Sequence, residues 1–144
     1  ADALWFLAKS PQKLNAHTYA TPHPGEAATL LEMKASGVEA DRIQTIKQLQ
    51  QKYQGQWVLK GSGSLILEDD LYICTAGNAG MGTGGMGDVL AGMIASLKAQ
   101  FRNTIHLHEI VTLHALAGDV LAEKGERGLQ AQDMKHAIYQ VVNH

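Results

Sequence analysis

Seven of the fifteen glycines of the chain lie within residues 77–92, whose sequence is GNAGMGTGGMGDVLAG. Glycine adopts positive φ readily and lets a ligand approach without a Cβ, so this run predicts main-chain N–H groups that face an anion. After Asp88 the pattern VLAGMIASLKA becomes helical, which places residues 84–88 at a helix N-terminus. Free N–H groups and the helix dipole favour negative charge there. We therefore expect an anion-binding loop with the Asp88 carboxylate beside it.

The composition narrows the class of partner. A chain of 144 residues that is 45% hydrophobic and 18% charged has the size and composition of one globular domain. A net charge of −2 gives no reason to expect a nucleic acid partner. The single cysteine, Cys74, cannot form an internal disulfide, and no apolar run approaches the roughly 18 residues that span a bilayer. We expect small or nucleotide ligands, no membrane partner and a cytoplasmic location.

The hydrophobic pattern predicts an α/β domain. Helices are expected at 4–8, from Pro24 to a C-cap at Gly37, at 41–52, after Asp88 to about 100, at 107–123 and at 131–142. Residues 57–60 predict a strand, and 65–67 with 71–74 predict a β-hairpin, with Cys74 in the core. In the helix at 41–52, Ile43, Ile46 and Leu49 share one predicted buried stripe. Three strands are too few to cover so many helices, so we expect further strands in a missing N-terminal part.

Two further segments offer ligand contacts. The sequence TPHPGE holds His23 between two prolines in an extended loop, which favours a displayed ligand contact over a merely solvated histidine. Lys60 precedes Gly61, Ser62, Gly63 and Ser64, so it resembles a phosphate contact more than a lysine that only ends a strand.

Other chemistries fit the sequence less well. The pattern GxGxxG occurs twice, at 80–85 and 82–87, but no acidic residue follows at the expected strand end about 20 positions on, which argues against a dinucleotide-binding Rossmann site. Neither a GxxxxGK[ST] phosphate loop nor a GxSxG serine nucleophile motif is present. A metal site at His106, His108 and His114 is disfavoured, because helical residues two apart point to different faces, so His106 and His108 could not share a metal if the helix includes both.

Four segments together identify a family. TPHPGEA, VLKGSGSLI, the glycine-rich stretch and the late HALAGD…RGLQAQD, in this order and spacing, closely resemble the ADP-dependent NAD(P)H-hydrate dehydratases. The resemblance covers essentially the whole chain. The glycine motif alone is shared with related vitamin kinases, whereas TPHPGE with KGSGS narrows the match to the dehydratases.

The resemblance implies a ribokinase-like three-layer α/β/α fold and repair of hydrated NADH or NADPH at the expense of ADP. His23 and Asp88 would contact the hydrated dinucleotide, with Asp88 as the catalytic base. The residues expected to contact the AMP portion of the nucleotide are Lys60, Gly61, Ser62, Gly63, Ser64 and Gly87. Gly84, Gly85, Met86 and Gly87 would form the anion hole, with Mg²⁺ compensating phosphate charge and no residue of the chain assigned as a metal ligand.

Family domains are nearly twice as long as this chain. Residues 1–144 would therefore be the C-terminal portion of one dehydratase domain, inactive without its N-terminal half, and we expect a homo-oligomer. Two other functions stay open: a ribokinase-like kinase for a small vitamin precursor, and a nucleotide-binding module without catalysis.

Overall fold

A computed structural model describes residues 2–143 of the chain, which divide into two compact units. The first unit runs to Ile73 and contains the sheet, and the second runs from Cys74 and is helical. The α/β class expected from the sequence is confirmed.

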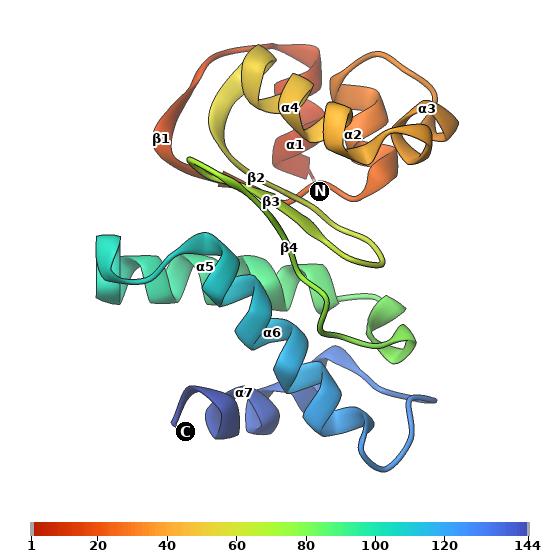
Figure 1. Cartoon of the computed structure of the whole chain (residues 1–144), viewed down its shortest axis with the longest axis vertical. Helices are drawn as coiled ribbons and strands as arrows, with labels where there is room; N and C mark the ends of the chain where they lie inside the picture. Colours follow the sequence, from red (N-terminus) through yellow and green to blue (C-terminus); the bar gives the residue numbers. More distant parts are fainter. Residues whose placement is uncertain (1, 144) are drawn as a thin grey trace. The chain divides into compact units, whose positions relative to one another are not determined.

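The first unit is a four-stranded sheet with helices packed on it (Figure 1). Its elements are α1 (Asp2–Lys9), β1 (Leu14–Ala20), α2 (Pro24–Leu30), α3 (Ala35–Ala40), α4 (Arg42–Tyr53), β2 (Gln54–Leu59), β3 (Leu65–Leu67) and β4 (Leu71–Ile73). The strand order is β1-β2-β3-β4; β1 runs parallel to β2, and the other two pairs are antiparallel. The hairpin predicted at residues 65–74 is therefore confirmed as β3 and β4.

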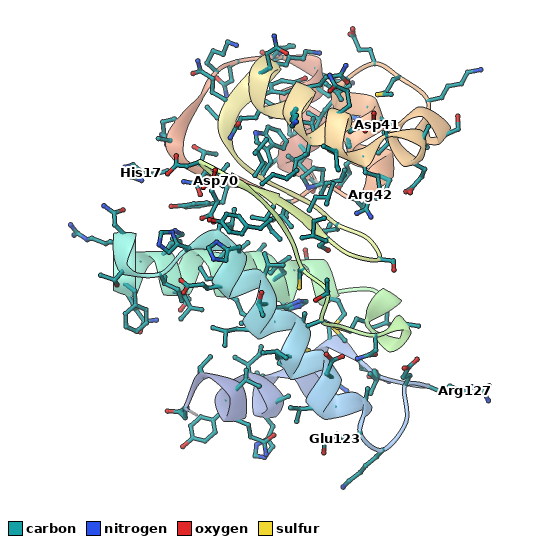
Figure 2. The ribbon with its side chains drawn as sticks, in the orientation of Figure 1. His17, Asp41, Arg42, Asp70, Glu123 and Arg127 are labelled. Atoms are coloured by element: carbon teal, nitrogen blue, oxygen red, sulfur yellow. The ribbon has the colours of Figure 1, made fainter. Side chains whose placement is uncertain are left out.

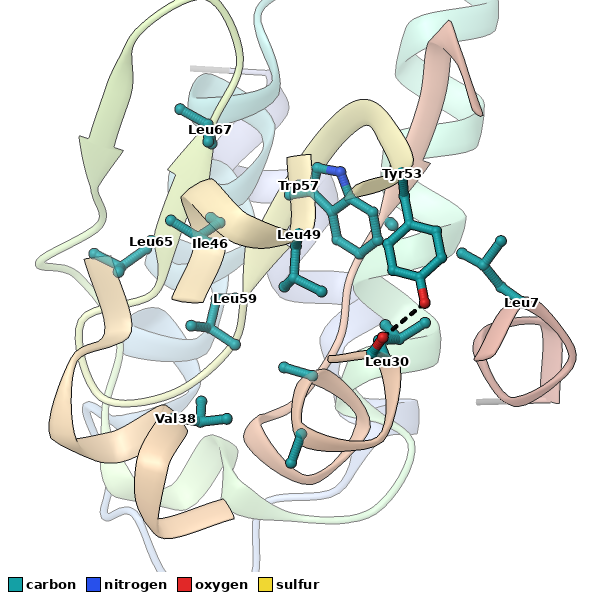
Figure 3. Close-up of a cluster of buried hydrophobic side chains, with 13 residues drawn as sticks. Leu7, Leu30, Val38, Ile46, Leu49, Tyr53, Trp57, Leu59, Leu65 and Leu67 are labelled. Atoms are coloured by element: carbon teal, nitrogen blue, oxygen red, sulfur yellow. Dashed lines mark hydrogen bonds between the residues drawn. The ribbon is translucent and has the colours of Figure 1, made fainter. Parts of the chain in front are cut away.

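The core of the first unit lies between the sheet and its helices (Figure 3). Trp57 and Leu59 of β2 alternate toward this core, where Ile46 and Leu49 of α4 meet them. The Tyr53 hydroxyl donates to the carbonyl of Leu30 at 2.7 Å, so the one polar atom of this buried ring is satisfied. Apolar burial of this kind supplies most of the stability of such a unit.

Two predictions for the first unit are wrong, and one strand was not predicted. The strand β1 was not predicted, because LNAHTYA has neither clean alternation nor β-branched enrichment and forms only through pairing with β2. The helix expected to end at Gly37 ends at Leu30, whose carbonyl instead accepts from Tyr53 and Lys52, and Gly37 lies inside α3. Ile43 is 43% exposed, and Thr45 takes the expected buried place beside Ile46 and Leu49.

The second unit is built from helices around the glycine-rich loop, residues 77–87. Its elements are the 3₁₀ turn η1 (Ala79–Gly82), α5 (Met86–Phe101), η2 (Arg102–Thr104), α6 (Leu107–Ala122), η3 (Ala131–Asp133) and α7 (Met134–Val142). Met86, Ala117, Met134 and Ala137 form one buried cluster in it, and Cys74 is buried as expected. The last helix begins at Met134 rather than at residue 131, because residues 131–133 form a 3₁₀ turn first. Within residues 2–143, no helix is both long and apolar enough to cross a bilayer.

Candidate active site

His23 caps α2 and keeps much of its ring exposed. Its Nδ1 accepts from the N–H of Glu26 at 3.2 Å, while its own N–H donates to the Glu26 carboxylate at 2.8 Å. This reciprocal pair is a capping box, so His23 has a structural role in addition to the ligand role expected from the sequence. The side chain is 57% exposed, and Nε2 lies 3.7 Å from the Glu26 carboxylate. Because Nδ1 is used as the acceptor, Nε2 is the ring nitrogen left to reach a ligand.

The carboxyl of Glu26 is ionised more readily than an ordinary glutamate. Burial acts to raise its pKa, but the hydrogen bond from the His23 N–H and the charges of His23 and Lys60 outweigh burial and lower the pKa overall. The Glu26 carboxylate of the TPHPGE segment is therefore attracted by the positive charge of Lys60.

The KGSGS loop (residues 60–64) meets the TPHPGE segment directly. The N–H of Lys60 donates to the carbonyl of Pro22 at 2.9 Å. Within the loop, Gly63 has φ +67°, a conformation in which a Cβ is strained, and the Ser64 hydroxyl donates to the Gly61 carbonyl at 3.2 Å. The structure thus brings together His23 and residues 60–64 within the first unit.

Arg42, the first residue of α4, supports the KGSGS loop through hydrogen bonds to backbone carbonyls. Figure 2 labels Arg42 next to Asp41, the N-cap of the same helix. Its guanidinium donates to the carbonyls of Ser62 at 2.7 Å, Leu59 at 3.2 Å and Lys60 at 3.4 Å. A fork of donors that gathers three carbonyl groups fixes the course of the loop. Arg42 was not predicted as a site residue, because nothing in its sequence neighbourhood distinguishes it from a solvated arginine.

The glycine-rich loop leads into α5 through a left-handed residue. Gly85 is the N-cap of α5 with φ +88°, and a Cβ added there would lie 3.0 Å from the Cβ of Ala131. The first N–H groups of α5, from Met86 onward, have no carbonyl partner within the helix. The predicted helix N-terminus at residues 84–88 is confirmed, and Gly84, Gly85, Met86 and Gly87 lie together there.

Neither the backbone conformation nor the neighbouring residues require glycine at positions 82 and 84. A Cβ built at either position meets nothing within 4 Å, and neither has a positive φ. Glycine at an open, unstrained position leaves room for a ligand to approach the backbone closely. Both positions therefore leave open space beside the loop that the sequence predicts to bind an anion.

Asp88 lies in the first turn of α5 and is exposed. Asp88 does not cap its own helix, since α5 has no side-chain cap. Within residues 2–143 the Asp88 carboxylate has neither a hydrogen-bond nor an ion-pair partner from the chain. It is free to accept a proton or a hydrogen bond from a ligand.

The histidines of α6 do not form a metal centre. In the described part of the chain, no group of three or more His, Cys, Asp or Glu side chains is placed to hold a metal ion. His106 precedes α6 as its N-cap, so the helix does not include both histidines, and the ring of His106 stacks on that of His108 with centroids 5.4 Å apart. His114 is buried and lies apart from this pair in the sequence of the helix.

A family model described as NAD(P)H-hydrate dehydratase matches residues 1–140. The chain belongs to the NAD(P)H-hydrate dehydratase family. This confirms the resemblance that the four sequence segments indicate.

Two curated relatives illustrate the match. A bifunctional NAD(P)H-hydrate repair enzyme of Coxiella burnetii is 46% identical over 147 residues, which is 99% of this chain and 30% of that protein. An ADP-dependent (S)-NAD(P)H-hydrate dehydratase of Neisseria meningitidis is 37% identical over 85% of this chain and 44% of that protein. The chain therefore spans less than half the length of these family members.

Solved structures give the same fold. The ADP/ATP-dependent NAD(P)H-hydrate dehydratase of Bacillus subtilis, co-crystallised with ATP and Mg²⁺, matches 87% of this chain and 47% of that chain, with a TM-score of 0.81 and 26% identity. A ribokinase-like superfamily protein of Enterococcus faecalis matches 99% of this chain and 51% of that chain, with a TM-score of 0.83 and 29% identity. The ribokinase-like fold expected from the sequence is confirmed.

In this member of the dehydratase family, the expected site residues form two groups. His23 and the KGSGS loop belong to the first unit, and residues 84–88 belong to the second. Each unit also has one residue that supports a glycine-containing loop and was not assigned a site role from sequence. Arg42 binds the KGSGS loop, and Asp119 binds Gly77 and Asn78 at the start of the glycine-rich loop. Asp119 stands in the HALAGD segment, which helps to identify the family but carries no predicted site residue.

Proposed function

We propose that this chain supplies the nucleotide-binding and catalytic part of an ADP-dependent NAD(P)H-hydrate dehydratase. The observation that carries the proposal is the unengaged Asp88 carboxylate at the N-terminus of α5, beside open glycine positions where a bound phosphate would fit. Membership of the dehydratase family and the structural match to an enzyme crystallised with ATP and Mg²⁺ support it.

Asp88 acts as general base in this mechanism. Its carboxylate accepts the proton of the hydrate hydroxyl, whose oxygen attacks the terminal phosphorus of ADP as the bond to the bridging oxygen breaks and AMP leaves. Charge that develops on the transferred phosphoryl group is stabilised by the N–H groups of Gly84–Gly87. The phosphorylated hydrate then loses inorganic phosphate, and a proton from the neighbouring carbon, to regenerate the dihydronicotinamide ring.

The remaining site residues bind and orient. His23 contacts the hydrated dinucleotide through Nε2, because Nδ1 is held by the Glu26 N–H. Lys60 to Ser64 contact the AMP portion of the nucleotide, and Gly87 assists them. The Lys60 ammonium adds a positive charge near the phosphate of this AMP portion.

Magnesium fits as a partner of the phosphates rather than of a protein cage. Residues 2–143 offer no cluster of three or more metal-binding side chains, and Mg²⁺ characteristically keeps several waters and binds through substrate phosphates. When bound, the ion would neutralise phosphate charge during transfer.

We further propose that residues 1–144 are the C-terminal portion of one dehydratase domain. The Bacillus subtilis chain is about twice as long as the part of it that this chain matches. This supports the proposal that a further N-terminal half completes the substrate-binding surface. A homo-oligomer and a reducing, cytoplasmic setting belong to the same proposal; the buried, unpaired Cys74 is compatible with the latter.

Product analysis tests the activity. The chain is joined to the part of the Coxiella burnetii dehydratase domain that it does not match, which gives a completed domain, and this is incubated with hydrated NADPH, ADP and Mg²⁺. We expect absorbance at 340 nm to recover with equal amounts of AMP and phosphate, and no recovery without ADP. A stable phosphoester of an added vitamin precursor would instead identify a small-molecule kinase. Nucleotide binding without either product would identify a binding module.

A further inference from the structure

The HALAGD segment of α6, residues 114–119, has no part in the mechanism above. Four of its residues share one face of the helix: His114 and Gly118 are four apart, as are Ala115 and Asp119. Each of the four lies against the glycine-rich loop or the first residue of α5, all within the second unit. We call these four residues the α6 brace.

Asp119 holds the start of the loop. Its Oδ2 accepts from the N–H of Gly77 at 2.9 Å, and its Oδ1 accepts from Nδ2 of Asn78 at 2.9 Å. Asn78 in turn accepts from the N–H of Gly80 at 3.1 Å through its own Oδ1. One carboxylate thus fixes two donors directly and a third through the Asn78 amide, and bonds to a charged acceptor are the stronger kind.

Gly118 and Ala115 provide the space for the loop. A methyl group at Gly118 would collide with the thioether of Met81, which lies in the notch left by the missing side chain. A Cβ added at Gly77 would lie 3.6 Å from that of Ala115, an ordinary van der Waals contact, so the loop passes close to the helix at this point. Small side chains at both positions permit this close approach.

His114 lies at the other end. It is 8% exposed and lies against the backbone of Met86, the first residue of α5, while its Nε2 is buried without a hydrogen-bond partner among residues 2–143. The loop is therefore held by hydrogen bonds at residues 77–80 and is packed against buried His114 at residue 86. Residues 83–85 lie between these two contacts, and Gly82 and Gly84 face open space.

We propose that the α6 brace positions the anion hole, with Asp119 as its principal positioning residue. Fixed ends hold Gly84–Gly87 in the conformation that binds phosphate before the nucleotide arrives, which lowers the ordering cost of binding. This role rests on the proposed function for the identity of the anion, and goes beyond it by assigning a task to a segment that touches no substrate.

The test exchanges the two hydrogen-bonding partners in the full chain. Asp119→Asn places an amide NH₂ against one of the existing donors, and Asn78→Asp opposes two carboxylates. The double variant Asn78→Asp/Asp119→Asn restores the arrangement, because the carboxylate introduced at position 78 can accept from the amide introduced at position 119, whose oxygen still accepts from the Gly77 N–H. Amide hydrogen exchange and ¹H–¹⁵N spectra report Gly77, Gly80 and Gly84–Gly87, and ADP with Mg²⁺ is the probe of binding.

We expect Asp119→Asn to lower the protection of Gly77 and Gly80 about 10-fold or more, to shift the Gly84–Gly87 signals and to weaken ADP binding about 10-fold. Asn78→Asp should be worse, and the double variant should return to within about 3-fold of wild type. The proposal is overturned if Gly84–Gly87 and the ADP Kd stay within twofold of wild type in Asp119→Asn, or if the double variant shows no recovery.

A milder variant covers the case in which Asp119→Asn does not fold. Asn78→Ala keeps the bond from Gly77 to Asp119 and removes only the relay to Gly80, so protection should fall at Gly80, persist at Gly77 and be accompanied by weaker ADP binding. Unchanged ADP binding in this folded variant would count against the brace. If wild type shows no response to ADP, the proposed function fails, while the shifts of Gly84–Gly87 in the variants still decide whether the brace positions them.

Discussion

The two glycine-containing loops of this chain are supported by opposite charges. The KGSGS loop is held by the Arg42 guanidinium, which binds backbone carbonyls. The start of the glycine-rich loop is held by the Asp119 carboxylate, which binds a backbone N–H and the Asn78 amide. A cation that occupies carbonyls leaves the N–H groups of its loop for an external anion, whereas an anion that occupies N–H groups excludes them from ligand binding.

The difference predicts where each loop can bind phosphate. The KGSGS loop can offer the N–H groups of Ser62 and Gly63 and the Ser62 hydroxyl, because Arg42 engages loop carbonyls, whereas the Lys60 N–H and the Ser64 hydroxyl are already bonded. The glycine-rich loop can offer only its second part, from Gly84 to the start of α5, because Gly77 and Gly80 are already bonded. The two loops are both rich in glycine, but they differ in which of their N–H groups are left to bind phosphate.

Asp88→Asn tests the proposed general base, which stands in the first turn of α5 directly after the glycine-rich loop. In the completed domain we expect kcat to fall by about 10²–10⁴-fold, because general-base catalysis contributes that much, while the ADP Kd changes little. Steady-state dehydration monitored at 340 nm and ADP titration measure the two quantities. A kcat within threefold of wild type would remove Asp88 from the mechanism.

Arg42→Met tests the support of the KGSGS loop. The variant keeps an apolar stem and removes three hydrogen bonds, so we expect ADP binding to weaken about 10-fold or more, with a smaller effect on kcat. Arg42→Lys is the matched control, since it keeps the charge but cannot gather three carbonyls, and it should lie between wild type and Arg42→Met. Equal ADP affinity in all three proteins would show that the loop does not depend on Arg42.

Gly85→Ala and Gly84→Ala separate a conformational glycine from a ligand-facing one. Gly85 has φ +88° and a close neighbour in Ala131, so alanine there should reduce the free energy of unfolding by about 1–2 kcal/mol. Gly84 has open space, so alanine should change stability by less than about 0.5 kcal/mol but weaken ADP binding. Thermal unfolding and ADP titration on both variants measure this, and the reverse pattern would contradict the assignment.

Acidification should affect the two units at different pH. Burial lowers the pKa of His114 below its ordinary 6.5, so the unfolded chain takes up the proton first, and stability falls as the pH drops below about 6.5. The pKa of Glu26 is lowered below 4.5, so its contribution is present above pH 4.5 and is lost below it. Amide exchange in each unit between pH 7 and 4 measures the order, and His114→Gln should remove the first loss only. Simultaneous weakening of both units near pH 4 would contradict it.

The sequence predicted the elements whose signal is local. The hairpin at Leu65–Ile73, the helix start at residues 84–88 and the helix from Leu107 follow from turn residues and periodicity alone. The errors depend on contacts distant in sequence. The edge strand β1 forms by pairing with β2, α2 ends where Tyr53 and Lys52 bind its carbonyl, and Arg42 gains its role from a loop about 20 residues away.

The candidate site divides in the same way. His23, Lys60 and Asp88 could be singled out because proline and glycine mark their loops. The capping bond at Nδ1 of His23 and the bond from Gly77 to Asp119 could not, since each needs coordinates to reveal which atom is already engaged.

An ADP titration of the chain in the presence of Mg²⁺, followed by amide signals, tests the contrast between the loops most directly. We predict saturable shifts at Ser62, Gly63 and Gly84–Gly87, whose N–H groups are available, and little change at Gly77 and Gly80, whose N–H groups are held by Asp119 and Asn78. Shifts confined to Gly77 and Gly80, with residues 62–63 and 84–87 unchanged, would contradict the account.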